Sequence, residues 1–353
     1  MIIDNWISQK IGLRPGTRLT RRALETWQLE RLRETLERVM EGSPFYREKL
    51  GTGTIDSLDS ITELPLTTPR ELAAEGYRMV CVPASSVSRI VTLRDPQGQK
   101  LASHAYPYET SGTMGSAKRI WFTAEDQELM VDYIHHGLPV MTGPGDVFLV
   151  LMPCERPGSV GDLVAAGVER IGSRAVRVGA IPSDGSRDEE VLALMRGEGV
   201  TTGLATGPTA ARLAAKSASD PYIVNNMKTI LLSAQYVSEA DKDIIESSWD
   251  CKAYEHYGMT EMGLGGAMSC VERAGYHPRE ADLLFEVVDP VTGMVLPEGE
   301  YGEIVFTTLT RAAMPLIRYR TGDFSRWLPG NCGCGSILRR LDKVGDRGGR
   351  KWY

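Results

Sequence analysis

The chain has 353 residues, 42% of them hydrophobic, which is enough to bury one large core or two moderate ones. Its formal charge of −6 is spread over 40 basic and 46 acidic side chains, without the long basic run that favours binding to nucleic acid or an anionic membrane. No stretch approaches the roughly 20 apolar residues of a transmembrane helix, and the N-terminus lacks the apolar segment of a signal peptide. We therefore expect a cytoplasmic, enzyme-sized protein.

The N-terminal part of the chain carries two helix signals. Apolar side chains recur at helical spacing between Leu19 and Met40, at Leu24, Trp27, Leu32, Leu36 and Val39. Gly42 follows as a helix stop. Further on, Thr68 precedes Pro69 and is followed three residues later by Glu71, the spacing of a capping box. These signals predict an amphipathic helix and a second helix that begins after Thr68.

Beyond residue 147 the pattern is that of an α/β protein. Short apolar runs predict strands at Val147–Met152, Val176–Ile181 and Thr229–Ser233, and helical patterns lie between them at Asp188–Arg196 and Pro208–Lys216. The alternation predicts parallel strands covered by helices. After Asp282 two strand-like runs, DLLFEVVD and EIVFTTL, are separated by turn-rich residues. We therefore expect an α/β core over 1–281 and a smaller β-rich subdomain over 282–353.

The segment 109–118, ETSGTMGSAK, has the composition of a phosphate-binding loop. Its glycines allow backbone N–H groups to approach an anion, its hydroxyls add donors, and its lysine adds a mobile positive charge. The spacing differs from that of a Walker A motif. Taken alone, the segment is equally consistent with a polar turn between two strands.

Two further segments suggest a family when they are read together with this one. ETSGTMGSAK, YGMTE at 257–261 and RYRTGD at 318–323 resemble, in order, the three signatures of the adenylate-forming superfamily of acyl-CoA synthetases, adenylation domains and luciferases. SPFYREKL at 43–50, LPLTTPREL at 64–72 and TTLTRAAMPLIRYRTGD at 307–323 are most similar to the phenylacetate–CoA ligase group. The resemblance spans nearly the whole chain. It implies the large N-terminal domain of the adenylate-forming fold, with mixed and parallel sheets covered by helices.

The resemblance also implies an ATP site and its residues. The β- and γ-phosphates would be held by Thr110, Ser111, Thr113 and Lys118, with Gly112 and Gly115 permitting close approach. Ala234, Gln235, Gly258 and Met259 would border the nucleotide, and Tyr257 would stack on its adenine. Thr260 would bind the α-phosphate, Glu261 would ligate Mg²⁺, and Asp323 would accept both ribose hydroxyls. Without the ordered set, Tyr257 reads as a core aromatic residue and Asp323 as a turn residue.

The chain departs from the family pattern at two places. Gln235 stands where the family usually has an acidic residue near adenine. LRRLDKVGDR at 338–347 resembles the hinge before the family's C-terminal lid domain, so we expect the lid to be absent from this chain. Lys351 matches no family lysine. Lys118, Mg²⁺ or a partner protein would then have to stabilise charge in the transition state.

Four metal-capable residues form two clusters, Cys270 with His277 and Cys332 with Cys334. Three thiolates and one imidazole suit a closed, tetrahedral, structural Zn²⁺ site. Some phenylacetate–CoA ligase-like proteins show a comparable arrangement, which favours zinc. The alternative is four ordinary buried or surface residues.

The acid pocket is the least legible part of the sequence. By resemblance its candidate residues lie between the phosphate loop and YGMTE: Tyr133, His135, His136, Thr206, Gly207 and Ala234. The two histidines are better explained as a pair on a helix surface than as substrate ligands.

The resulting hypothesis is a ligase that activates a small, aromatic carboxylic acid with ATP and releases pyrophosphate. CoA, a carrier-protein thiol or an amine would accept the acyl group, and a homodimer is consistent with the resemblance. The alternative is a non-catalytic subunit that binds nucleotide or acyl-adenylate and needs a partner supplying the lid.

Overall fold

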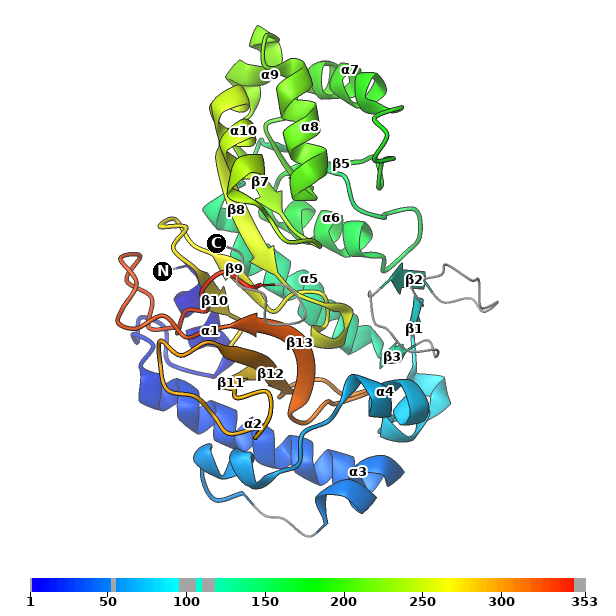
Figure 1. The fold of residues 1–353 in the computed structure, drawn as a ribbon, viewed down its shortest axis with the longest axis vertical. Helices are drawn as coiled ribbons and strands as arrows, with labels where there is room; N and C mark the ends of the chain where they lie inside the picture. Colours follow the sequence, from blue (N-terminus) through cyan, green and yellow to red (C-terminus); the bar gives the residue numbers. More distant parts are fainter. Residues whose placement is uncertain (1, 52–54, 95–105, 110–117, 346–353) are drawn as a thin grey trace.

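The computed structural model describes residues 2–51, 55–94, 106–109 and 118–345. Figure 1 shows an upper part built on a long sheet and a lower part in which N-terminal helices lie against a small sheet from the C-terminal region. The α-helices are α1 (Ile2–Lys10), α2 (Arg21–Gly42), α3 (Pro44–Leu50), α4 (Pro69–Glu75), α5 (Ala124–Gly137), α6 (Val160–Ile171), α7 (Asp188–Glu198), α8 (Gly207–Ser217), α9 (Pro221–Asn226) and α10 (Glu239–Trp249). Helix α2 confirms the predicted amphipathic helix.

The larger sheet has seven strands and is mixed, as expected for the predicted fold class. Its strands, in spatial order, are β10 (Tyr276–Pro278), β9 (Ala267–Ser269), β8 (Lys252–Tyr257), β7 (Thr229–Leu232), β6 (Thr202–Ala205), β4 (Val147–Val150) and β5 (Arg174–Arg177). From β8 to β5 the strands are parallel, while β9 and β10 are antiparallel to their neighbours. The predicted parallel strands with intervening helices are therefore confirmed.

One predicted strand boundary was wrong. The apolar run Val176–Ile181 predicted a strand, but β5 begins at Arg174 and ends at Arg177. The amides of Val178 and Gly179 both donate to the carbonyl of Val150, at 3.2 Å, and Gly179 has φ of 86°. This positive φ turns the chain out of the sheet, so the apolar run continues beyond the strand.

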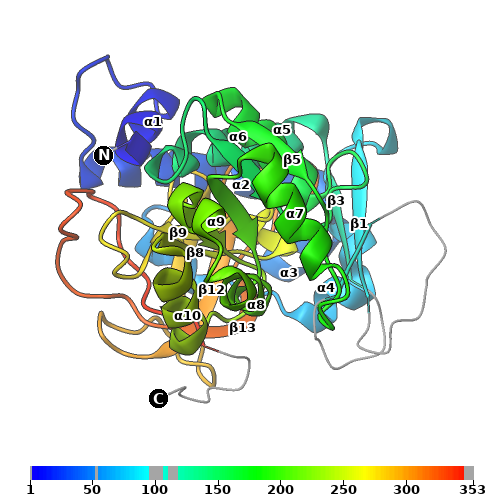
Figure 2. The same ribbon diagram turned by 90° about the horizontal axis from the view of Figure 1, so that it is seen from above.

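Alternate residues of the central strands face two helical layers. Phe148 and Val150 pack in a cluster with residues of α5 and α6, whereas Leu149 and Leu151 pack with residues of α7 to α10. This is the two-residue periodicity of a strand buried on both faces. Figure 2 shows the helices on both sides of the sheet. The layers leave the carboxyl ends of the parallel strands as the edge where a site can form.

The smaller C-terminal sheet has the order β11 (Leu283–Val288), β12 (Gly302–Thr308), β13 (Tyr319–Ser325) and is antiparallel. The first two strands were predicted, but β13 was not, because its sequence YRTGDFS is polar and contains glycine. Every residue of β12 is buried, and Phe306 and Ile304 share a core cluster with Leu32 and Leu36 of α2. The division at residues 281 and 282 stays a prediction.

A third sheet was not predicted. Strand β1 (Arg89–Arg94) lies between β2 (Tyr106–Glu109), to which it is parallel, and β3 (Arg119–Phe122), to which it is antiparallel. Strands β2 and β3 flank residues 110–118 on either side. The predicted phosphate loop therefore connects two strands of one sheet.

The capping box at α4 is present and gives a stability prediction. The Thr68 hydroxyl accepts from the Glu71 amide at 3.2 Å, and the Glu71 carboxylate accepts from the Thr68 amide at 2.8 Å. We expect Thr68→Ala to lower the free energy of unfolding by about 1 kcal/mol, because it leaves a helix N-terminal amide unpaired. Urea unfolding measures the change. Thr62→Ala, at an exposed residue, is the control, and equal effects of the two substitutions would contradict the capping role.

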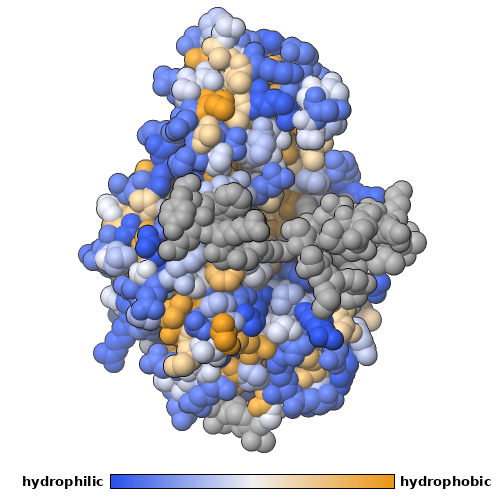
Figure 3. Space-filling model, viewed as in Figure 1, coloured by the Kyte–Doolittle hydropathy of each residue, from blue (hydrophilic) through white to orange (hydrophobic). Residues whose placement is uncertain are grey.

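The molecular surface leaves the predicted homodimer untested. The face in Figure 3 is mostly hydrophilic over the upper helices and carries hydrophobic residues in its lower half. Among the described residues, no helix is both long and apolar enough to cross a membrane.

Candidate active site

A cavity of about 570 Å³ lies at the carboxyl ends of the parallel strands, the edge at which α/β sheets bind ligands. One part of its wall is apolar and comes from α5, α6 and the strands: Met130, Ile134, Met152, Leu163, Val164, Leu204 and Leu231. The other part comes from the segment after β7, from the end of β8 and the segment after it, and from β13: Ala234, Gln235, Tyr257, Gly258, Met259, Thr260 and Asp323. These seven residues are all predicted nucleotide or catalytic residues, so the cavity collects two of the three motifs.

Tyr257 and Asp323, 66 residues apart in the chain, are joined by a hydrogen bond. The Tyr257 hydroxyl donates to Asp323 Oδ2 at 3.0 Å. Beside them, a Cβ on Gly258 would come within 2.1 Å of the Leu264 carbonyl, so only glycine fits this turn. Ala234 and Gln235 are exposed at the cavity mouth. The structure thus brings the predicted adenine and ribose residues to one side of the cavity.

The phosphate-loop residues Thr110, Ser111, Gly112, Thr113 and Gly115 lie outside the described residues. Lys118, the last residue of the loop, is described and is mostly buried. Its Nζ lies 3.2 Å from Glu261 Oε1 and 3.4 Å from the Tyr319 hydroxyl. The first and second motifs therefore meet through Lys118 and Glu261.

Glu261 is fully buried in a short 3₁₀ helix, η5 (Thr260–Met262), directly after β8. Its Oε1 accepts from the Tyr319 hydroxyl at 3.2 Å, whereas its Oε2 has no hydrogen-bond partner among the described residues. A buried carboxylate oxygen needs a donor or a cation. Oxygen is the ligand that Mg²⁺ prefers, so Glu261 fits the predicted magnesium role.

Arg311 holds η5 in place through the main chain of that helix, and the sequence analysis did not identify this arginine as a site residue. Its Nη1 donates to the Glu261 carbonyl at 2.6 Å. Burial lowers the pKa of Arg311 to about 10, and nearby Arg279 adds to this, while Asp126 and Glu261 oppose it. The side chain therefore remains a cation at neutral pH. The sequence analysis also missed Tyr319 as a site residue, although it lies inside the third motif. No sequence pattern indicates that Arg311 or Tyr319 contacts Glu261.

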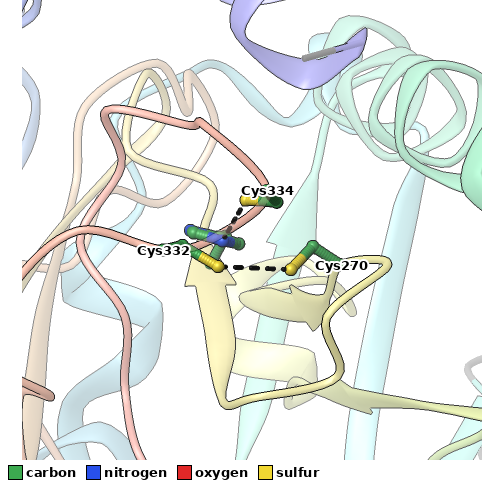
Figure 4. Close-up of side chains that lie close together, drawn as sticks. Cys270, Cys332 and Cys334 are labelled. Atoms are coloured by element: carbon green, nitrogen blue, oxygen red, sulfur yellow. Dashed lines mark hydrogen bonds between the residues drawn. The ribbon is translucent and has the colours of Figure 1, made fainter.

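The predicted metal residues converge on one point. The ligand atoms of Cys270, His277, Cys332 and Cys334 all lie within 4.8 Å of one another. Cys270 Sγ is 3.6 Å from Cys332 Sγ, and Cys334 Sγ is 3.4 Å from His277 Nε2. Figure 4 shows the three cysteines pointing toward one another from two different segments. Tetrahedral ligands at about 2.3 Å from zinc are about 3.8 Å apart, so the donor set and its spacing fit zinc.

A second contact orients the histidine of this cluster. His277 Nδ1 lies 3.1 Å from the carbonyl of Arg339, to which it can donate. That bond leaves Nε2 free of hydrogen and directed at the thiols, the arrangement of metal-bound histidines. The cluster joins β9 and β10 of the large sheet to the loop after β13.

The acid-pocket candidates divide into two groups. Tyr133 and Ala234 line the cavity. His135, His136, Thr206 and Gly207 are not among its lining residues, so the structure does not bring them together with the other candidates. His136 stacks on Trp6 of α1, and Thr206 caps α8, which begins at Gly207. His136 and Thr206 thus support helices, which for His136 agrees with the alternative that the histidine pair has a structural role.

Comparison with known proteins agrees with the motifs. Residues 48–311 match the family of AMP-binding enzymes. The chain is 29% identical to a phenylacetate–coenzyme A ligase of Pseudomonas putida, over 92% of this chain and 71% of that protein. It is 28% identical to the Escherichia coli phenylacetate–coenzyme A ligase, over 92% and 71% of the two chains.

The fold also matches a solved structure. A 2-hydroxyisobutyryl-CoA ligase in complex with 2-HIB-AMP and CoA superimposes with a TM-score of 0.80 and 22% identity, over 93% of this chain and 69% of that one. The predicted fold class is therefore confirmed. Because the family match covers residues 48–311, which is more than half of the chain, the chain belongs to the AMP-binding enzyme family.

Proposed function

We propose that the chain is an AMP-forming acid–CoA ligase that activates a small aromatic carboxylic acid. The observation that carries this proposal is the meeting of Lys118 with Glu261 beside a cavity bordered by Tyr257, Thr260 and Asp323. The curated relatives that span 92% of the chain bear the name phenylacetate–coenzyme A ligase, which supports both the aromatic acid and CoA as acyl acceptor.

In the proposed first step, the acid's carboxylate attacks the α-phosphorus of ATP. The bond from the α-phosphorus to the bridging oxygen breaks, and pyrophosphate leaves with that electron pair. Tyr257 and Asp323 hold the adenosine, and Thr260 donates to the α-phosphate. Lys118 neutralises phosphate charge together with the loop residues Thr110, Ser111 and Thr113. Positioning and charge neutralisation supply most of the rate enhancement.

Glu261 would hold the Mg²⁺ that accompanies ATP, through its unpartnered Oε2. When bound, the cation supplies positive charge to the phosphates. Tyr319 and Arg311 keep the carboxylate in place, one through Oε1 and the other through the main-chain carbonyl. Cys270, His277, Cys332 and Cys334 would hold a structural Zn²⁺ whose role is to join β10 to the loop after β13.

The test of the proposal is acid-dependent exchange of labelled pyrophosphate into ATP, with purified protein, Mg²⁺ and a panel of aryl and short aliphatic acids. We expect exchange with at least one arylacetic or benzoic acid, and AMP-forming thioester synthesis when CoA is added. Exchange without thioester formation would point to a carrier-protein thiol or an amine, or to a partner that supplies a lid. ATP binding with no exchange for any acid would favour the non-catalytic subunit and contradict the proposal.

A further inference from the structure

A serine and a histidine form a polar pair on the wall of the same cavity. His256 on β8 and Ser233, one residue beyond β7, both line it. The parallel pairing of β7 with β8, which places Leu232 opposite Glu255, brings the next residues of both strands together. Ser233 Oγ lies 2.9 Å from His256 Nδ1. The other ring nitrogen, Nε2, is buried and has no hydrogen-bond partner among the described residues.

The surroundings of the pair explain why the imidazole stays neutral. Burial, and to a lesser degree the Arg279 guanidinium, lowers the pKa of His256 to about 4. A neutral imidazole has one nitrogen that donates and one that accepts, so Nε2 has one unmet bond in either tautomer. The Tyr133 ring lies beside it, with ring centroids 6.4 Å apart. A Cβ on Gly265 would come within 2.5 Å of that ring and 3.4 Å of Nε2, so the glycine is what allows the main chain to pack against the Tyr133 ring at this point.

Tyr133 also lines the cavity, and its buried hydroxyl likewise has no hydrogen-bond partner among the described residues. The remaining residues of this part of the wall are apolar. Met152, Leu204 and Leu231 at the strand ends, with Leu163 of α6, would surround the hydrocarbon part of an acid. An apolar acid would leave the buried His256 Nε2 without a partner, whereas an acid that supplies one gains a hydrogen bond on binding. A hydroxyl both donates and accepts and can therefore satisfy Nε2 in either tautomer.

We propose that the acid carries a hydroxyl group and that His256, held by Ser233, recognises it. This inference rests on the proposed function, because it assigns the substrate class of the same site. His256 then acts as a specificity-determining residue that does not take part in the adenylation chemistry.

The experiment compares matched pairs of acids in the pyrophosphate exchange assay: phenylacetate with its 2-, 3- and 4-hydroxy derivatives, benzoate with its hydroxy derivatives, and isobutyrate with 2-hydroxyisobutyrate. We expect kcat/KM to be roughly 10- to 100-fold higher for the best hydroxy acid than for its parent. The aryl and alkyl pairs distinguish a phenolic from an aliphatic hydroxyl. If no acid supports exchange, the proposed function fails; if parents exchange as well as their hydroxy derivatives, only this inference is overturned.

Variants test the assignment to His256. His256→Leu should remove the preference, by lowering kcat/KM for the hydroxy acid while leaving or raising it for the parent. His256→Gln can place an amide near the position of Nε2 and should keep part of the preference. Met152→Leu, a change within the apolar wall, should alter both acids in parallel. A preference that persists unchanged in folded, ATP-binding His256→Leu and is also insensitive to Ser233→Ala would overturn the assignment.

Discussion

Replacement of Glu261 with glutamine is expected to lower the rate of pyrophosphate exchange by roughly 10²- to 10³-fold, the usual cost of losing one preorganised charge contact at a reacting phosphate or oxyanion. Glutamine keeps the shape of the side chain but removes its negative charge. Two cations then lose the negative charge that faces them. One is Lys118, whose Nζ is 3.2 Å from Glu261 Oε1, and the other is the Mg²⁺ that the unpartnered Oε2 would bind. We expect the apparent KM for Mg²⁺ to rise together with the fall in kcat.

The matched control is Glu280→Gln. Glu280 is also buried, but it pairs with Arg21 and is not among the residues that line the cavity. Its substitution should alter thermal stability while the exchange rate stays within about twofold of the unmodified protein. Tyr319→Phe provides an intermediate case, because it removes only the hydroxyl that bridges Lys118 and Glu261. If Glu261→Gln retains near-normal exchange and Mg²⁺ dependence, Glu261 has a structural role only.

The sequence predicted which distant segments would meet, because each motif carries residue types that ATP requires. Tyr257 and Asp323 were assigned to adenine and ribose, and the structure places them 3.0 Å apart at their polar atoms. Lys118 and Glu261 were assigned to phosphate and metal, and they lie in contact. These contacts bring residues of different motifs together, while the site and the roles of its residues stay predictions until exchange is measured.

The contacts that support the site were not predictable in the same way. Arg311 acts through a main-chain carbonyl, which any residue offers, so no side-chain pattern identifies its partner. The Ser233–His256 contact depends on the register of β7 against β8, and register is a tertiary property. The resemblance made His135 and His136 candidates for the acid pocket, yet His136 stacks on Trp6 of α1 and neither histidine is among the residues that line the cavity.

Loss of the metal cluster is expected to have the largest effect on stability. Binding of structural zinc is worth about 10–16 kcal/mol in small zinc peptides, and each kcal/mol shifts Tm by roughly 2–4 °C in proteins of 150–250 residues. Cys270 follows β9 and Cys332 lies in the loop after β13, so the ion would strengthen a junction that Tyr276 and Leu341 already make through two backbone hydrogen bonds. We expect one zinc per purified chain by mass spectrometry, and a fall in Tm of at least about 10 °C after strong chelation or in Cys332→Ser.

The chain contains its own control for this substitution. Cys154 is a partly buried free thiol outside the four-residue cluster, so Cys154→Ser should keep both the zinc content and Tm. Zinc should restore the Tm of chelated protein, whereas Mg²⁺ should not, since thiolate and imidazole ligands bind the softer ion. Exchange activity should fall with Tm and recover with zinc, because η5 lies in the connection between β8 and β9, one strand away from Cys270. Protein that contains no zinc and whose Tm does not respond to chelation would show that the four residues are ordinary core and surface groups.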